Sequence, residues 1–253
     1  MQYAIIPNDQ TLDLANRGDI HFVLAQRVFE SEEYADFFAR SNKYKIMDNG
    51  AFELGKSLDV EELITAAKII GADELIAMDE PRNPADSYDL TRQYIEEIVE
   101  LGLSKEYKIH VVPHGKTPAE YIDYYKKCLQ LGPDVIGFSI LDLWKWNPLL
   151  RPYIVNMLYH ERFMPAGIEY HLLGLDMPHE IFCYGSVPIR SVDTSMPFSK
   201  AYGNESLFGA DTPRIPKHAS LSPAQTELAE RNIDQLLSIC HDYGHKGLMA
   251  GQI

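Results

Sequence analysis

Short apolar runs alternate with amphipathic stretches along most of the chain. The runs are rich in β-branched and aromatic residues, and turn-forming residues follow them within a few positions. The eight runs of strand length cover residues 3–7, 21–25, 44–48, 74–79, 108–113, 135–140, 170–174 and 189–194. Between most of them lie stretches with the apolar spacing of a helix. The alternation predicts an α/β fold with a parallel sheet, and eight strands predict one (β/α)8 TIM barrel that takes up residues 1–253 as a single domain.

Helix boundaries are marked most clearly in the middle of the chain. Residues 60–70 and 88–101 each place their apolar side chains on one face. Thr117, Pro118 and Glu120 form a helix start, with threonine as the N-cap, and the predicted helix continues over 121–131. The glycines that follow these helices suit a left-handed C′ position, namely Gly71, Gly102 and Gly132.

After the last predicted strand the composition changes. Residues 201–223 are rich in Gly, Pro, Ser and Asn, so we expect a long loop there, then a C-terminal helix over 224–243 and a tail over 244–253. With 253 residues, 45% of them hydrophobic, the chain can bury the core of one large domain. Three cysteines without a C-x-x-C pair predict neither disulfides nor a cysteine-rich zinc site, which favours a cytoplasmic protein. The amino terminus lacks a signal-peptide pattern and no apolar stretch is long enough to span a bilayer, so we expect a soluble protein without membrane partners.

The formal net charge of −14 is unfavourable for binding nucleic acid, because proteins that do so are usually basic or carry a basic patch. Acidic residues crowd the predicted helices, whereas Arg190, Lys200, Arg214 and Lys217 lie near strand ends and in late loops. This distribution leaves room for a local basic lip on an acidic exterior. Net charge therefore does not exclude a polynucleotide substrate.

Three of the apolar runs lead to an aspartate. Asp48, Asp79 and Asp193 each come at a predicted strand end, and a turn residue or proline follows. In a parallel barrel such positions share one face, which is where (β/α)8 enzymes hold their chemistry. The structural alternative for each carboxylate is a helix cap or a bond to turn amides. The recurrence of the pattern favours a shared active site.

Four segments in order along the chain resemble the motifs of the tRNA-guanine transglycosylases and their phage and bacterial DNA-modifying relatives. They are Met47-Asp48-Asn49-Gly50-Ala51-Phe52, Ala77-Met78-Asp79-Glu80, His171-Leu172-Leu173-Gly174-Leu175 followed by Pro178, and Asp193 followed by Pro197. They look like the family's Asp-Ser-Gly-Gly-Phe box, its Phe-Asp-Glu box, its Leu-Met-Gly-Val-Gly-x-Pro turn and its Asp-Cys-Val-x-Pro box.

The resemblance implies a role for each matching residue. Asp193 corresponds to the nucleophile, Asp48 to the general acid/base, and Asp79 to the residue that binds the N1–H and exocyclic amine of guanine. Breaking the C1′–N9 bond passes through an oxocarbenium-like state that a carboxylate can trap as an ester, as in retaining glycosidases, so the chemistry suits these residue types. The base has to leave the stack, and Phe52 or Phe138 is a candidate to sandwich it, with a place in the core as the alternative.

The chain also departs from the family pattern. His114, in Pro113-His114-Gly115, stands where the family has a base-contacting glutamine, and Gly137-Phe138-Ser139 stands for a longer glycine-rich segment. We count His114, Gly137, Leu173 and Gly174 among the candidate substrate-binding residues. The family's zinc site of three cysteines and a histidine is absent, and this makes DNA the preferred acceptor over tRNA. The implied incoming base is a 7-deazaguanine, no cofactor is implied, and a homodimer stays open. A phage-encoded protein would act in the host cytoplasm.

Other readings of the same residues remain. Water in place of a new base would make the protein a hydrolytic N-glycosylase or nucleoside hydrolase, and a non-catalytic transglycosylase-like subunit is a third alternative. His110, His114 and His171 with Asp193 could suggest a metal-dependent hydrolase, but the early His-x-His pair of such barrels is missing, so we expect no metal. A tryptophan pair, Trp144 and Trp146, is expected to cap the barrel rim, or else to stack on nucleic acid.

Overall fold

The computed structural model describes residues 1–81, 83–141, 147–210 and 219–250, with residues 244–250 described by their backbone alone. The tryptophan pair expected at the barrel rim lies outside the described residues. The chain divides into two compact units, which are described separately below. One combines Met1–His21 with Leu172–Ile253, and the other is Phe22–His171.

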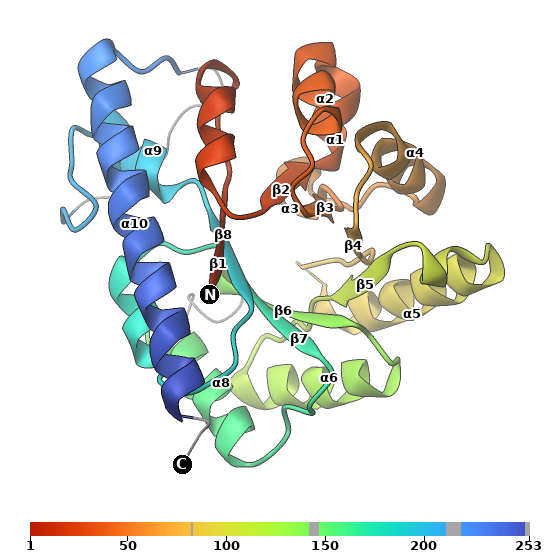
Figure 1. Cartoon of the computed structure of the whole chain (residues 1–253). Coiled ribbons are helices and arrows are strands. Elements are labelled where there is room, and N and C mark those ends of the chain that lie inside the picture. The colour runs from red at the N-terminus through yellow and green to blue at the C-terminus, as the bar shows by residue number, and fades with distance from the viewer. Residues whose placement is uncertain (82, 142–146, 211–218, 251–253) are drawn as a thin grey trace. The chain divides into compact units, whose positions relative to one another are not determined.

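All eight predicted strands are present, and they form the predicted α/β (β/α)8 barrel, which is nearly closed (Figure 1). The strands are β1 Gln2–Ile5, β2 His21–Leu24, β3 Lys45–Asp48, β4 Glu74–Ile76, β5 Lys108–Val111, β6 Val135–Ser139, β7 Glu169–Leu173 and β8 Ser191–Thr194. Their order in the sheet is β1-β8-β7-β6-β5-β4-β3-β2, and a parallel bridge joins Ala4 of β1 to Ile20, just before β2. The pairings that are described residue by residue, such as β3 with β4 and β4 with β5, are parallel.

Helices and 3-10 turns separate the strands. The α-helices are α1 Ala25–Glu30, α2 Glu32–Ala39, α3 Ala51–Leu54, α4 Val60–Ile70, α5 Pro84–Glu100, α6 Pro118–Gln130, α8 Leu150–His160, α9 Met196–Tyr202 and α10 Pro223–Ala250. The 3-10 helices are η1 Asp9–Arg17, η2 Leu103–Lys105 and η3 Pro178–Cys183.

The 22–171 unit is built where the sequence signals are strongest. Helix α4 has the predicted bounds because Asp59 and Glu62 form a capping box at its start and Gly71, at φ +65°, ends it. Thr117 caps α6 as predicted, since its side chain accepts a hydrogen bond from Glu120 N at 3.2 Å. The apolar faces of these helices are buried, as Leu63 and Tyr121 illustrate with no exposed surface. Periodicity and caps therefore agree with the packing.

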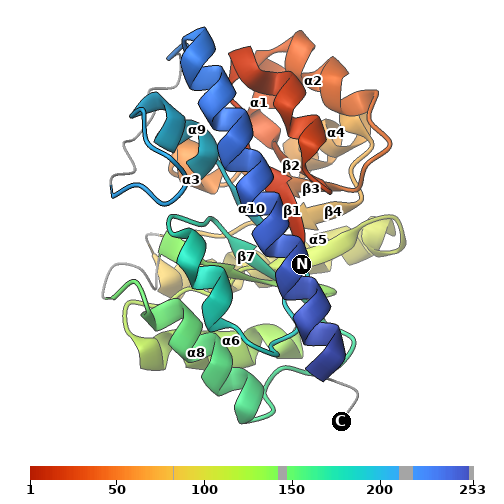
Figure 2. The same ribbon diagram turned by 60° about the vertical axis from the view of Figure 1, so that its left-hand side comes forward.

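The other unit combines the first and last parts of the chain. β1 pairs in parallel with β8, and α10 packs on both β1 and α9 (Figure 2). The terminal ammonium of Met1 donates to Cys240 O on α10 at 3.2 Å. The expected loop begins after Tyr202, because residues 201–202 complete α9, and α10 begins at Pro223. The expected tail from residue 244 is wrong up to residue 250, since the helix continues to Ala250.

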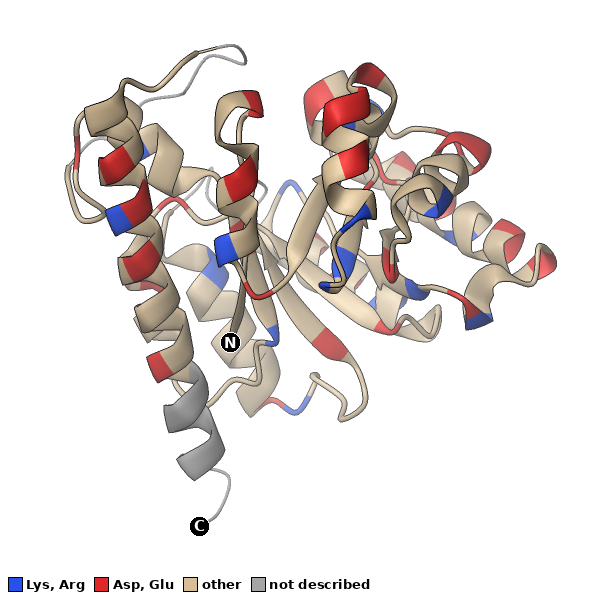
Figure 3. Ribbon diagram, turned by 45° about the horizontal axis from the view of Figure 1, so that its top comes forward, with Lys and Arg blue, Asp and Glu red and all other residues tan. Residues whose placement is uncertain are grey.

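Acidic residues are frequent on several helices, as the sequence pattern predicts (Figure 3). Glu61 on α4 and Glu96 and Glu97 on α5 are exposed. The expected basic lip loses one member, because Lys200 is 3% exposed and its Nζ donates to Gly209 O at 2.6 Å. Two other members, Arg214 and Lys217, lie outside the described residues. In the part of the chain that the structure describes, no helix combines the length and the apolar character needed to cross a membrane.

Candidate functional site

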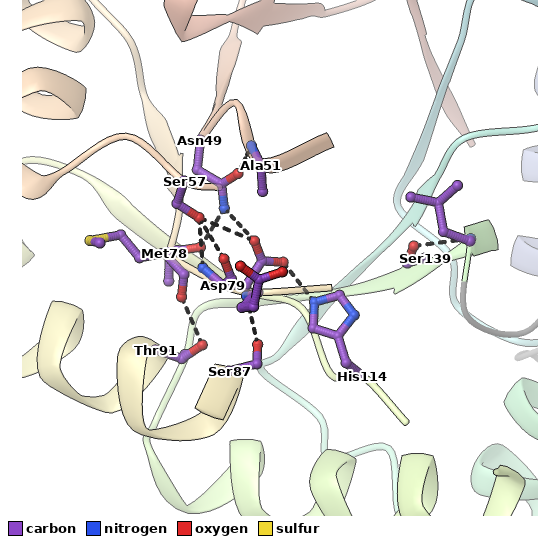
Figure 4. Close-up of polar contacts among 12 residues, drawn as sticks. Asn49, Ala51, Ser57, Met78, Asp79, Ser87, Thr91, His114 and Ser139 are labelled. Atoms are coloured by element: carbon purple, nitrogen blue, oxygen red, sulfur yellow. Dashed lines mark hydrogen bonds and ion pairs between the residues drawn. The ribbon is translucent and has the colours of Figure 1, made fainter. Parts of the chain in front are cut away.

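Three neighbouring strands of the 22–171 unit deliver polar side chains from the residues that follow them. Asn49 comes directly after β3, Asp79 lies in the loop after β4, and His114 lies in the loop after β5. Because β4 pairs with both β3 and β5, the three side chains meet (Figure 4). All three are buried. Asp79 therefore lies a short distance beyond its strand and not at its last residue, which is Ile76.

Both oxygens of the Asp79 carboxylate are hydrogen-bonded. Asn49 Nδ2 donates to Oδ1 at 2.9 Å, and the Nε2 atom of His114 is hydrogen-bonded to Oδ2 at 2.7 Å. Ser57 Oγ lies 3.4 Å from Oδ1. A carboxylate oxygen can accept more than one hydrogen bond, so each oxygen keeps acceptor capacity. Because these partners fix its orientation, the carboxylate can accept further hydrogen bonds only from a defined direction.

The loop that carries Asp79 is also clamped through its backbone. Ser57 Oγ accepts from Asp79 N at 2.9 Å and donates to Asp79 O at 2.7 Å. Thr91 Oγ1 of α5 donates to Met78 O at 2.9 Å, and Ser87 Oγ accepts from Glu80 N at 3.0 Å. Hydroxyl groups on both sides therefore bond four backbone polar groups of residues 78–80.

Tyr124 of α6 completes this support. Its hydroxyl donates to Ser87 Oγ at 3.2 Å, and its ring packs edge-on against the His114 ring with centroids 6.2 Å apart. Burial is the main cause that raises the pKa of Tyr124, and the Asp79 carboxylate contributes to the rise. The phenol thus stays protonated and can serve as a donor.

Asp48, the candidate general acid/base, is the last residue of β3 and is half-buried. Its Oδ2 accepts from Gly50 N at 3.0 Å, while Asn49 Oδ1 accepts from Ala51 N at 2.9 Å. The turn requires glycine, because Gly50 has φ +80°. Phe52, on the short helix that follows, is 56% exposed, so it is not part of the core. It is available to stack on a planar ligand.

Phe138, the second aromatic candidate, has different surroundings from Phe52. Phe138 in β6 is fully buried and stacks between Tyr125 and Tyr170, with both centroid distances 5.9 Å. Its carbonyl accepts from Arg151 Nη1 at 3.0 Å. The core alternative is therefore correct for Phe138, and Gly137 lies inside the same buried strand.

The candidate nucleophile belongs to the other unit. Asp193 lies in β8, is 3% exposed, and accepts from Gly174 N at 3.1 Å on Oδ1. Gly174 has φ +75° and directly follows Leu173, the last residue of β7. The Gly174 amide thus supports Asp193. Tyr3 of β1 is buried, and burial raises its pKa well above the ordinary value, with further increments from the Cys240 thiol and from Asp193.

The histidines of the metal alternative lie in different surroundings. His110 and His171 are fully buried, with rings packed edge to face at 5.5 Å. His110 Nδ1 is hydrogen-bonded to the buried Glu74 at 2.7 Å, and Tyr44 donates to the other Glu74 oxygen at 2.8 Å. Across the described ranges, no group of three or more His, Cys, Asp or Glu side chains is placed to hold a metal ion.

Sequence reasoning selects the three aspartates, His114 and Gly174 as candidates but misses Asn49 and Ser57, which orient Asp79. Asn49 stands inside a quoted motif, yet its bond to Asp79 depends on the pairing of β3 with β4. Ser57 follows a short helix and carries no local signal, because its partners are backbone groups of another strand's loop. In the 22–171 unit, the fixed Asp79 carboxylate keeps acceptor capacity, and Asp48 supplies a half-buried carboxyl group at the end of the neighbouring strand.

Comparison of the chain with protein-family models and with curated proteins gave no match, so the functional argument rests on the fold and on these contacts.

Proposed function

We propose that this protein is a base-exchange glycosyltransferase. It replaces a guanine in a polynucleotide, with DNA preferred over tRNA, by a 7-deazaguanine through a covalent aspartyl-nucleotide intermediate. The proposal takes its reaction from the motif resemblance and its residue roles from the positions of the matching residues.

The observation that carries the proposal is where the four motif segments fall. The key residue of each lies near the carboxyl end of a barrel strand: Asp48 is the last residue of β3, Asp79 follows β4, Gly174 follows β7, and Asp193 is the penultimate residue of β8. In (β/α)8 enzymes the carboxyl ends of the strands carry the catalytic residues.

In the first half-reaction, an Asp193 carboxylate oxygen attacks C1′ of the target nucleotide. The C1′–N9 bond breaks, its electron pair leaves with guanine, and Asp48 donates a proton to the departing base. Gly174 N–H, which already binds Asp193 at 3.1 Å, keeps the nucleophile oriented. Asp48 suits proton transfer as the half-buried carboxyl group at the end of β3, because a carboxyl group within reach of the base can act as general acid and then as general base.

In the second half-reaction, N9 of the incoming 7-deazaguanine attacks C1′ and releases the Asp193 carboxylate, while its N9 proton passes to Asp48. The two steps balance and need no cofactor. Asp79, fixed by Asn49 and His114, accepts hydrogen bonds from the base edge. Phe52 is exposed on the short helix α3 that follows Asp48 in the chain, and it supplies a stacking surface.

Exchange of label tests the proposal. Purified protein is incubated with radiolabelled 7-deazaguanine and, in separate reactions, with duplex DNA, single-stranded DNA and tRNA. We expect one polymer to gain label and a denaturation-resistant protein–polymer adduct to form when the incoming base is withheld. Adding 7-deazaguanine should discharge the adduct. Discharge by water at the same rate would instead identify a hydrolase, and a protein inert with every polymer would favour the non-catalytic subunit.

Variants assign the roles. Asp193→Asn should form no adduct, because an amide cannot form the ester with C1′. Asp48→Asn should slow base release by roughly 10²- to 10⁴-fold while polymer binding stays near normal. Asp123→Asn is the matched control, since Asp123 is an exposed residue of α6 whose contact is an ion pair with Lys127 at 2.9 Å. Full exchange activity in Asp193→Asn would end the nucleophile assignment.

A further inference from the structure

Gln26 is a buried carboxamide that the proposed reaction has not used. It is the second residue of α1, directly after β2, and is 6% exposed. Its Oε1 atom is completely buried and has no hydrogen-bond partner among the described residues. Buried side-chain oxygens nearly always have a partner, so this one calls for an explanation.

The carboxamide lies against the turn that holds the candidate acid/base. A Cβ atom added to Gly50 would lie 3.2 Å from Gln26 Oε1, and the Gly50 amide is the one that donates to Asp48. Asn49, which precedes Gly50 in the chain, donates a hydrogen bond to Asp79. Gln26 therefore borders the same turn as Asp48 and belongs to the same 22–171 unit as Asp79 and His114.

The base of the proposed reaction would supply a donor to the unsatisfied Gln26 Oε1. Asp79 offers acceptors only, so the O6 acceptor of an incoming base needs a donor from another residue. A carboxamide presents one acceptor and one pair of donors side by side. That pattern complements the N1–H and O6 of guanine and of 7-deazaguanine, which are also a donor and an acceptor side by side.

We propose that Gln26 is a specificity-determining residue that reads this amide edge of the base, with Oε1 accepting N1–H and Nε2 donating to O6. Gln26 then takes the N1–H that the motif resemblance gives to Asp79, and Asp79 accepts from the exocyclic amine. The inference rests on the proposed function, because that function names the base. It explains why a buried oxygen stays without a protein partner: the partner arrives with the substrate. A methionine of similar shape would pack at the same position without leaving an acceptor unsatisfied, so the free protein retains Gln26 at a cost in stability.

The test compares Gln26→Met with Gln93→Met, an exposed position on α5. Binding of 7-deazaguanine is measured by calorimetry without polymer, and the melting temperature is measured on the same samples. We expect Gln26→Met to melt higher than the wild type and to bind the base roughly 10- to 100-fold more weakly, because the edge loses its partners. Gln93→Met should leave binding unchanged.

A second ligand distinguishes a hydrogen-bonding role of Gln26 from a packing role. N1-methyl-7-deazaguanine lacks the N1–H donor, so it should bind the wild type weakly, and Gln26→Met should cause little further loss. An equal loss for both bases would mean that Gln26 acts through packing, and wild-type affinity of Gln26→Met for 7-deazaguanine would also overturn the inference.

The binding measurement is independent of the exchange assay. Wild-type protein that binds 7-deazaguanine but transfers none to any polymer would remove the transglycosylase and leave the role of Gln26 intact. Exchange that is unaffected by Gln26→Met would do the opposite. A wild type that binds no 7-deazaguanine overturns this inference whatever the exchange assay shows.

Discussion

Replacement of Asn49 tests whether the contacts around Asp79 hold this part of the fold together. The side chain is 2% exposed and makes three hydrogen bonds: Nδ2 to Ala77 O at 2.7 Å, Nδ2 to Asp79 Oδ1 at 2.9 Å, and Oδ1 from Ala51 N at 2.9 Å. Asn49→Ala removes all three and leaves their partners buried. A bond to a carboxylate contributes about 1.5–3 kcal/mol and a neutral one about 1 kcal/mol, so we expect a loss of roughly 3–5 kcal/mol. For a chain of this size that lowers the melting temperature by roughly 6–20 °C.

Asn49→Asp keeps the shape but places a carboxyl group against Asp79. The neighbouring negative charge and burial raise the pKa of the new group above its value in the unfolded chain. A raised folded pKa means that the favourable contribution is present at low pH and is lost as pH rises through that pKa. The deficit of Asn49→Asp relative to the wild type should therefore be small at about pH 4 and grow towards about pH 8.

Circular dichroism melts of the three proteins at each pH supply the measurement. Asn147→Asp is the control, because Asn147 is exposed and bonds to Leu149 N through its oxygen, which aspartate retains. Melting temperatures of Asn49→Ala within 2 °C of the wild type (less than about 1 kcal/mol) would refute the assigned hydrogen bonds. A deficit of Asn49→Asp that does not change with pH would refute the charge argument.

Two further predictions follow from the glycines and the thiols. Gly71→Ala should lower the free energy of unfolding by about 1 kcal/mol, because Gly71 has φ +65° in open space. Gly50→Ala should lower it by roughly 2–4 kcal/mol, because the new Cβ would also crowd Gln26 and Leu54 at 3.2 Å. Equal urea midpoints for the two variants would contradict this. With a chromogenic disulfide reagent, only the Cys183 thiol of the native protein should react, because Cys128 and Cys240 are buried and burial raises the pKa of Cys240 to about 12. All three thiols of the denatured protein should react. Rapid labelling of Cys240 in the native protein would count against the packing of α10.

The fold could be predicted from the sequence largely because its strands and caps are local signals. Helix α4 shows this best, since its apolar stripe, its capping box and Gly71 all agree. Helices α1 and α2 were not delimited, because α1 is short and follows β2 without a cap. Ser31 does cap α2 through Tyr34 N at 3.2 Å, a signal that is readable in retrospect. The helical course of residues 244–250 was missed because Gly244 resembles a C-cap.

The candidate site was predictable only as far as each residue's place on its strand. Asp48 falls at the end of β3 because an apolar run stops there. The contacts of Asp79 could not be read in the same way, since Asn49 and His114 reach it from neighbouring strands whose register is a tertiary property. Gln26 stands out only through an unsatisfied oxygen, which a sequence does not display. The roles assigned to Asp48, Asp79 and Asp193 stay predictions until exchange is assayed.

The turn after β3 has a consequence for the chemical lifetime of the protein. Asn49 precedes Gly50, and in flexible chains an Asn-Gly pair loses ammonia readily, when the glycine nitrogen attacks the side-chain amide carbon and the resulting succinimide hydrolyses to aspartate or isoaspartate. In the folded protein the Gly50 nitrogen is bound to Asp48 and the Asn49 amide makes three hydrogen bonds, so the attack is hindered. Unfolding releases both groups. Each unfolded interval therefore converts some molecules into chains that carry an acidic residue beside Asp79 and refold poorly, so that reversible unfolding gradually becomes irreversible ageing.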